Sequence, residues 1–335
     1  AWMMAKLFNT MERRPEFLDA ARSGVEFLRS HSAAPDGKLY FLVTRDGRPL
    51  RMRRYAYSEA FSAIANAAYA RAAGDEASHN AAIALFGAYL DYSFTPGQTT
   101  PKWEMQTRPM IGIGPLMIGV SIAQELRENL GDVVVQGKTC TQWIDDFITQ
   151  IERNFVKPDW EAVMEVVAPD GAILDHFDGR QLNPGHAIEC AWFLLHEGKL
   201  RGERRYIDLG LAMLDWMWKR GWDEEYGGLF YFRDLRGLPV QEYWHDMKFW
   251  WPHCEAIIAS ILAWKLTGDE KYVRMHAAVH DWSFRHFADA EYGEWFGYLH
   301  RDGRLSSRLK GNVWKGPFHL PRMLWYCTRL LEEKA

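Results

Sequence analysis

Three histidines in this chain follow a proline or glycine in contexts that indicate helix starts. They are His186 in NPGHAIEC, His253 in WWPHCEA and His319 in GPFHLPR. An imidazole titrates near neutral pH, so histidine is well suited to remove and return protons during catalysis. If the three helices begin at the same end of a helical assembly, we expect these side chains to line one cavity.

Carboxylates accompany two of these histidines. Glu189 follows His186 by three residues, a spacing that places both side chains on one helix face. Asn183 is suited to cap this helix, and the proline after it suits the first turn. A neighbouring carboxylate raises an imidazole pKa and fixes the orientation of the ring. The residues alone leave two interpretations open: a general acid–base pair, or a buried hydrogen bond without chemistry.

The second histidine context has a less regular spacing. Glu255 follows His253 by two residues, so the two side chains do not share a helix face as cleanly. Trp251 stands just before them, and the stretch is either part of a site or an aromatic loop packed on a helix start. His276 and His280 have a metal-type i,i+4 spacing, but without an evident third ligand we expect them to be exposed.

Helices of period 3.6 must position these side chains. Apolar spacing predicts helices over 58–73, 79–92, 115–128, 186–196, 205–219, 253–266, 270–286 and 319–333. Two inserts between helices, YGGLFYFRDLRG from residue 226 and YGEWFGYLHRDG from residue 292, are 66 residues apart. A looser copy covers 36–50, and each insert is predicted to form a short β-hairpin. Repeated helical hairpins favour an all-α fold of stacked α/α units, either closed into an (α/α)6-type barrel or left as an open array.

The composition excludes several classes of protein. The net charge is −4 without a long basic run, which argues against a nucleic-acid surface. No apolar stretch approaches the length that crosses a bilayer. The four cysteines are scattered without metal-type spacing, which favours free thiols and a cytoplasmic location. The aromatic content of 14% suits either stacking against sugar rings or a helical core.

Long motifs in the same order resemble a known family. NPGHAIECAWFLL, KFWWPHCEA, DAEYGEWFGYLHRDGRL and KGPFHLPR together resemble the N-acylglucosamine 2-epimerases, also known as renin-binding protein. RMRRYAYSEAF resembles the upstream segment of that family. The resemblance covers nearly the whole chain. It implies one (α/α)6 barrel domain over residues 1–335, with hairpin inserts, that interconverts N-acetylglucosamine and N-acetylmannosamine.

The resemblance also implies roles for individual residues. His186 and His319 would be the two bases on opposite faces of the sugar C2, and Glu189 and Glu255 would set their pKa values. His253 would contribute to the choice of substrate rather than to the shared chemistry, because related cellobiose 2-epimerases share the other two histidines and have Gln at this position. The enediolate oxygen would be stabilised by Arg54 or Lys248. The full set of expected substrate-binding residues is Arg54, Tyr57, Glu59, Asn183, Lys248, Trp251 and His253.

Such a proton transfer requires no metal and no redox cofactor. Some family members are activated by ATP, so ATP is a possible allosteric activator, although no feature of this sequence decides the point. The expected partner is a small amino sugar rather than a nucleic acid or a membrane, with a homodimer possible.

One departure from the family pattern concerns the N-terminus. The family opens with a first helix, a hairpin and a WLQxR segment before the region that matches AWMMAKLFNT. We expect that first helix, and the sugar-binding Arg after it, to be missing from this sequence. Two alternatives to the epimerase remain: an aldose–ketose isomerase on the same scaffold, or a non-catalytic sugar-binding or regulatory protein.

Overall fold

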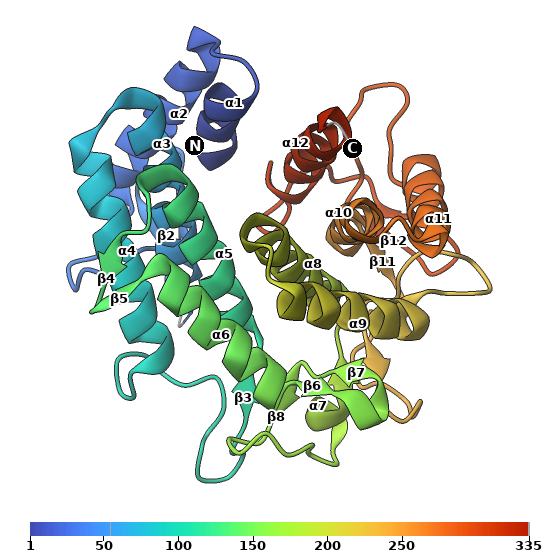
Figure 1. The fold of residues 1–335 in the computed structure, drawn as a ribbon. Coiled ribbons are helices and arrows are strands. Elements are labelled where there is room, and N and C mark those ends of the chain that lie inside the picture. The colour runs from blue at the N-terminus through green and yellow to red at the C-terminus, as the bar shows by residue number, and fades with distance from the viewer. Residues whose placement is uncertain (54, 334–335) are drawn as a thin grey trace. The chain divides into compact units, whose positions relative to one another are not determined.

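The computed structural model describes residues 1–53 and 55–333, and most of them are helical (Figure 1). Close contacts divide the chain into two compact units. The first comprises residues 1–109 and 115–149, and the second comprises residues 110–114 and 150–335. Each unit has its own core, and the assignment of residues 1–335 to a single domain stays a prediction.

The first unit is built on pairs of antiparallel helices. Its helices are α1 (Trp2–Thr10), α2 (Pro15–His31), α3 (Tyr57–Ala73), α4 (Glu76–Phe94) and most of α5 (Gly114–Leu130) and α6 (Cys140–Asn154). Its strands are β1 (Leu42–Val43), β2 (Pro49–Arg51), β4 (Val134–Val135) and β5 (Lys138–Thr139). Alanines dominate the buried face of α3, which lets α1 and α4 pack closely on it.

The second unit carries the three histidine motifs. Its long helices are α8 (Pro184–Arg201), α9 (Arg204–Gly221), α10 (Trp250–Thr267), α11 (Glu270–His286) and α12 (His319–Glu332). Helix α10 packs against α8, α11 and α12. Its residues 250–263 are buried without a break, as expected for a helix that is apolar on all sides.

Short segments join these helices. They are β3 (Ile111–Gly112), β6 (Val156–Lys157), the 3-10 turn η1 (Pro158–Trp160), β7 (Ala162–Val163), β8 (Val166–Val167), α7 (Phe177–Arg180), β9 (Gln181–Leu182), β10 (Arg233–Asp234), β11 (Lys248–Phe249), β12 (Tyr298–Leu299) and β13 (Leu305–Ser307). The sheets pair β3 with β8, β6 with β7, β9 with β10, β11 with β12, and β12 with β13.

The predicted helices are confirmed, with shifts of a few residues at their ends. They correspond to α3, α4, α5, α8, α9, α10, α11 and α12. Helices α2 and α6 were not among them. The signal for α6 was present in the sequence, because Ile144, Phe147, Ile148 and Ile151 follow a helical spacing and are all buried.

The repeat of the two aromatic inserts is confirmed, and the structure adds a further copy at the same offset. Antiparallel bridges join Trp222 to Leu229 and Ala288 to Trp295, at the same 66-residue offset as the sequence repeat. The pair Val156 with Val163 in β6 and β7 stands one further offset upstream. Valines replace the aromatic residues of the other inserts there, which is why the sequence pattern did not indicate this copy.

The hairpin predictions have mixed outcomes. The hairpin over 36–50 is confirmed by the antiparallel pairing of β1 with β2. The insert from residue 292 does form a hairpin, but between β12 and β13, with β11 added as a third strand. The hairpin over 226–237 is wrong, because β10 pairs with β9 of a distant segment instead. Strands of two residues have too few bonds of their own to fix a partner, so the packing around them decides.

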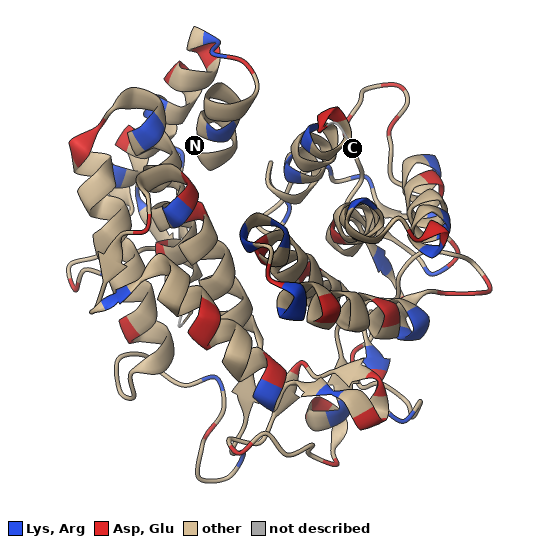
Figure 2. Cartoon of the chain, in the orientation of Figure 1, with Lys and Arg blue, Asp and Glu red and all other residues tan. Residues whose placement is uncertain are grey.

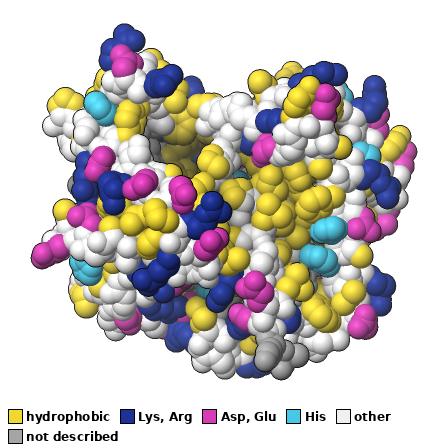
Figure 3. All heavy atoms as spheres, turned by 90° about the horizontal axis from the view of Figure 1, so that it is seen from above, with side chains coloured by type: hydrophobic (Ala, Val, Ile, Leu, Met, Phe, Trp, Pro, Cys, Tyr) yellow, Lys and Arg dark blue, Asp and Glu magenta, His cyan; other side chains and the backbone are white. Residues whose placement is uncertain are grey.

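Charged side chains of both signs are interspersed along the helices of each unit (Figure 2). Figure 3 shows one face of the molecule as spheres, and basic and acidic side chains are mixed there among apolar ones. No helix in the described part of the chain is both long and apolar enough to cross a lipid bilayer.

Candidate active site

Asn183 fixes the start of α8 and the position of His186. The Asn183 side-chain oxygen accepts a hydrogen bond from the His186 backbone N–H at 3.1 Å, so the predicted N-cap is confirmed. The His186 Nδ1 lies 3.0 Å from both carboxylate oxygens of Glu165. An ionised carboxylate can only accept, so Nδ1 carries the proton and Nε2 carries the lone pair. This tautomer is the one that a base acting through Nε2 requires.

His319, the first residue of α12, is held in the same way from another helix. Its Nδ1 donates to Glu255 Oε1 at 2.7 Å. The second Glu255 oxygen accepts from the Trp192 indole N–H at 2.7 Å, and Arg322 lies 2.7 Å from it. The indole and the guanidinium hold the Glu255 carboxylate in place, and the carboxylate in turn orients the imidazole. His319 therefore also presents Nε2 as its basic nitrogen.

Arg322 provides the positive charge of this cluster. Its guanidinium is buried and forms ion pairs with both Glu189 and Glu255. Burial raises the pKa of Glu255, but Arg322 and His319 outweigh it and hold that pKa well below its ordinary value. Burial likewise lowers the pKa of Arg322, and the two carboxylates more than offset this. Glu255 is therefore an anion at neutral pH, which supports the tautomer assigned to His319.

Glu189, Glu255 and His319 also have the composition of a metal site. One donor atom from each lies within 4.8 Å of the others. Arg322 already pairs with both carboxylates, so a cation of the protein itself offsets part of their negative charge. A metal ion would have to displace a buried guanidinium and leave it uncompensated. The cluster therefore does not fit a metal ion.

Trp251 brings the two histidines together. Its ring centroid lies 5.0 Å from that of His186 and 5.7 Å from that of His319. The centroids of the two imidazole rings can therefore be no farther apart than the sum of these two distances. Tyr231 packs edge-on against the same indole at 6.0 Å. The prediction that His186 and His319 lie together is confirmed.

His253 does not join this pair. Its ring stacks on Trp282 at 4.9 Å and is completely buried. Its Nε2 accepts from the Leu229 backbone N–H at 2.9 Å, and its Nδ1 donates to the Phe249 carbonyl at 2.6 Å. Burial lowers its pKa to about 3, so the ring is neutral. The expectation that three histidines line one cavity is wrong for His253, because backbone groups use both ring nitrogens.

Lys248 has a similar structural environment. Its ammonium is wholly buried, 3.0 Å from Asp223 Oδ2, and burial lowers its pKa to about 8. Arg301 pairs with the same carboxylate at 2.8 Å. Burial raises the pKa of Asp223, but Arg301 and Lys248 together lower it to about 2. We therefore assign Lys248 a role in the core instead of the expected contact with the enediolate oxygen.

The predicted pairing of His186 with Glu189 is not formed. The i,i+3 spacing shows only that two side chains share a face, and Arg322 takes the Glu189 carboxylate. The partner of His186 is Glu165, which the sequence interpretation missed. A lone carboxylate in the apolar run AVMEVV was the available signal. The signal for Arg322 was its position three residues after His319.

The remaining expected substrate contacts lie elsewhere in the chain. Tyr57 begins α3 of the first unit, and its ring stacks on Tyr55 at 5.8 Å. Glu59 is buried and accepts from the Leu39 backbone N–H at 2.8 Å, and its pKa is raised by burial. Arg54 lies outside the described residues. The roles of all three in substrate binding stay predictions.

Comparison with known proteins agrees with this geometry. The family described as N-acylglucosamine 2-epimerase (GlcNAc 2-epimerase) matches residues 1–319. The N-acylglucosamine 2-epimerase of Bos taurus is 37% identical over 99% of this chain and 79% of its own length. That of Homo sapiens is 35% identical over 98% of this chain and 78% of its own length.

Solved structures establish the fold. A cellobiose 2-epimerase from Bacillus thermoamylovorans is similar with a TM-score of 0.83 and 18% identity, over 98% of this chain and 85% of that chain. A D-mannose isomerase is similar with a TM-score of 0.77 and 19% identity, over 99% of this chain and 85% of that chain. The predicted all-α fold of the (α/α)6 barrel type is thereby confirmed. The family match and the identities show that the chain belongs to the N-acylglucosamine 2-epimerase family of sugar epimerases.

Proposed function

We propose that the protein interconverts N-acetyl-D-glucosamine and N-acetyl-D-mannosamine by exchanging the proton at C2 of the open-chain sugar. The observation that carries the proposal is the pair His186 and His319, which flank Trp251 with Nδ1 of each held by a carboxylate. The names of the mammalian relatives supply the sugar. Two bases on opposite faces of C2 are what inversion at that carbon needs.

The proton transfers divide between the two histidines. In the open-chain aldehyde, Nε2 of one histidine removes the C2 proton, and the electron pair moves onto the C1 oxygen to give an enolate. The other histidine, protonated on Nε2, returns a proton to the opposite face. Glu165 and Glu255 stabilise the imidazolium that forms at each step, because each accepts from Nδ1–H. The reverse reaction exchanges the two roles.

Trp251 offers a flat apolar surface between the two bases. An aromatic face suits the C–H groups of a sugar, and the indole is already packed against Tyr231. We infer that the indole aligns C2 between the two Nε2 atoms and reduces the water around the enolate. Glu189 would act through Arg322 and not on a histidine directly.

Proton exchange at carbon transfers no electrons, so we expect no redox cofactor. We expect no metal either, because Arg322 already forms ion pairs with both carboxylates of the cluster. Full activity after exhaustive treatment with EDTA is the predicted result. We also propose a cytoplasmic location, supported by four buried cysteines that form no disulfide. A homodimer and activation by ATP are further parts of the proposal. Analytical ultracentrifugation and assays with and without ATP test these points.

Product analysis distinguishes the proposal from its alternatives. Incubation with N-acetyl-D-mannosamine should yield N-acetyl-D-glucosamine, resolved by anion-exchange chromatography. Ketose formation from D-mannose in its place would indicate an aldose–ketose isomerase, in which the proton returns to C1. Saturable binding of the amino sugar without turnover would indicate a non-catalytic binding protein.

A further inference from the structure

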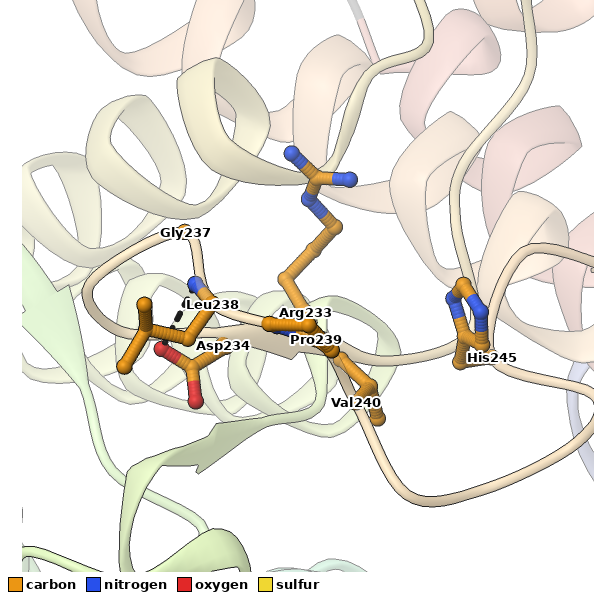
Figure 4. A pocket seen from close by; sticks show the side chains of 7 residues that line it. All are labelled: Arg233, Asp234, Gly237, Leu238, Pro239, Val240 and His245. Atoms are coloured by element: carbon orange, nitrogen blue, oxygen red, sulfur yellow. Dashed lines mark hydrogen bonds between the residues drawn. The ribbon is translucent and has the colours of Figure 1, made fainter.

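A cavity of about 340 Å³ lies in the second unit, along the segment that joins β10 to β11 (Figure 4). Its lining residues are Arg233, Asp234, Gly237, Leu238, Pro239, Val240 and His245. None of them belongs to the histidine pair or its carboxylates. Ligand cavities in proteins start at about 300 Å³, so this one has room for a small molecule and not only for an ion.

The carboxylate of the lining is already used by the protein. Asp234 Oδ2 accepts from the Arg180 guanidinium at 3.0 Å. Its other oxygen accepts from the backbone N–H groups of Arg236 and Leu238, at 2.8 and 3.2 Å. Figure 4 shows the contact with Leu238 as a dashed line. Both oxygens of Asp234 are therefore engaged within the protein and shape the loop.

Arg233 and His245, the two lining residues with nitrogen-bearing side chains, differ from Asp234 in their contacts. Arg233 stands over the Phe230 ring at 4.5 Å, and no ion pair or hydrogen bond of its guanidinium occurs among the described residues. The His245 ring also has no hydrogen-bond partner within residues 1–53 and 55–333. In Figure 4 the two side chains come from separate parts of the segment that lines the cavity.

The charge on Arg233 is not matched by its neighbours. The nearby cations Lys248 and Arg301 have their own carboxylates, Asp223 for both and Glu225 for Arg301 alone. That group of four is neutral as a set. Arg233 thus remains as a half-buried positive charge with its donors unused, beside a cavity that has an apolar wall of Leu238, Pro239 and Val240.

We propose that this cavity binds a small organic anion, with a phosphate or carboxylate group on Arg233 and His245 and an apolar body against Leu238, Pro239 and Val240. The planar guanidinium matches the two oxygens of either anion. The imidazole adds a third donor. Because the amino sugars proposed as substrates are neutral, this ligand is a different molecule at a second site, and the inference does not depend on the epimerase assignment.

Isothermal titration calorimetry with phenyl phosphate, benzoate and inorganic phosphate tests the proposal. Binding of phenyl phosphate or benzoate supports it and identifies the anionic group. Arg233→Gln should weaken that binding on the order of 10–100-fold, the usual effect of losing charge-assisted hydrogen bonds. His245→Gln should weaken it by a smaller factor. Inorganic phosphate should bind more weakly than phenyl phosphate, because it lacks an apolar body.

Arg236→Gln is the matched control. It removes the same charge from the same loop, but Arg236 pairs with Asp175 on the surface and does not line the cavity. Unchanged binding in this variant supports a specific site, and weakening equal to that of Arg233→Gln overturns it. Absence of binding by both organic anions at millimolar concentration also overturns it. If circular dichroism shows that Arg233→Gln does not fold, Arg233→Lys takes its place. Lysine keeps the positive charge but lacks the planar guanidinium that can bind two oxygens at once.

Discussion

A histidine becomes a useful base here because its second nitrogen is occupied. His186 and His319 each give Nδ1–H to a carboxylate, Glu165 in one case and Glu255 in the other. The two carboxylates come from unrelated places in the chain, a short strand connection and a buried helix. The arrangement at each histidine is nevertheless the same. Both rings are oriented, and both can accept a proton at Nε2.

Glu165→Gln should lower kcat on the order of 10²-fold or more. A glutamine can place an N–H on Nδ1, where the Asn183 amide nitrogen already lies at 3.1 Å. Two donors at Nδ1 would move the ring proton to Nε2, and His186 would no longer be a base in the required tautomer. Steady-state kinetics with both epimers measures the effect.

Glu161→Gln is the control for that change. Glu161 is exposed and pairs with Lys219 on the surface, so its activity should equal that of the unmodified protein. Equal kcat values for Glu165→Gln and the unmodified protein would show that His186 does not depend on this carboxylate.

The sequence identified the two histidines of the site but did not identify the carboxylates that orient them. His186 and His319 were named from their turns, and they do lie together. Glu165 could not be paired with His186, because 21 residues separate the two and no local spacing joins them. Glu189 was assigned to His186 because the two share a helix face. The full charge of Arg322 is the stronger partner for a carboxylate, and it decides where Glu189 points.

At the scale of elements, the close approach of α8 and α10 sets the position of Trp251. A Cβ atom on Gly185 would lie 2.6 Å from the Trp251 ring and 2.9 Å from Pro252. Only glycine therefore allows the indole to lie where it contacts both imidazoles.

Gly185→Ala should displace Trp251 and lower kcat/KM about 10-fold or more, while both histidines remain present. Gly316→Ala is the matched control, because a Cβ there meets nothing within 4 Å although it stands close to His319 in sequence. Kinetics together with near-UV circular dichroism of the tryptophans would check this. An unchanged spectrum and unchanged kinetics in Gly185→Ala would show that Trp251 has room to adjust.

The loop before α12 is held by an ion pair between a buried lysine and an exposed glutamate. Lys315 is 3% exposed, and its ammonium lies 2.6 and 2.7 Å from the two oxygens of Glu294. The same ammonium stands 5.8 Å from the Trp250 ring, which contacts His319 edge-on at 6.2 Å. We infer that the pair positions the segment that delivers His319.

Lys315→Met should lower kcat about 10-fold with a smaller change in KM, because the proton acceptor is displaced while most binding contacts remain. Lys310→Met removes a partly exposed ion pair with Asp289 in the same loop and should have little effect. If the two variants lose activity equally, the loop as a whole matters and Lys315 has no special part in it.

Element by element, helices were more predictable than strands. A helix satisfies its own backbone, so periodic apolar residues suffice to indicate it. The two-residue strands of the inserts depend on distant partners, as β10 does on β9. The repeat was visible where aromatic residues marked it and was missed at Val156 and Val163, where the geometry is kept with different side chains.

At the scale of the whole molecule, buried carboxylates make the free energy of unfolding depend on pH in the acid range. The pKa values of Asp223 and Glu255 are both below their ordinary values of 3.8 and 4.5. A carboxyl group with a lowered pKa in the folded state adds stability that is complete above its unfolded pKa. That stability is lost as the pH falls through the folded pKa. The free energy of unfolding should therefore fall between about pH 4 and pH 2, with about 2 kcal/mol from Asp223.

Urea unfolding followed by tryptophan fluorescence at a series of pH values measures this. Asp223→Asn should destabilise the protein by about 3–5 kcal/mol at pH 7, because it leaves the buried Lys248 without its carboxylate, while Arg301 keeps only Glu225. The same variant should show a flatter acid dependence. A midpoint of acid destabilisation above pH 5 would assign the effect to other groups.

The central claim is that His186 and His319 are the two bases at C2. Proton NMR of N-acetyl-D-mannosamine and N-acetyl-D-glucosamine in deuterated water tests it most directly, with His186→Asn, His319→Asn and the partly exposed control His280→Asn. We predict that the first two variants each lose net epimerisation on the order of 10²–10⁴-fold or more. One should still exchange deuterium into C2 of one epimer without inverting it, because the remaining histidine can remove and return the proton on its own face. Epimerisation at near the unmodified rate in both variants would contradict the account.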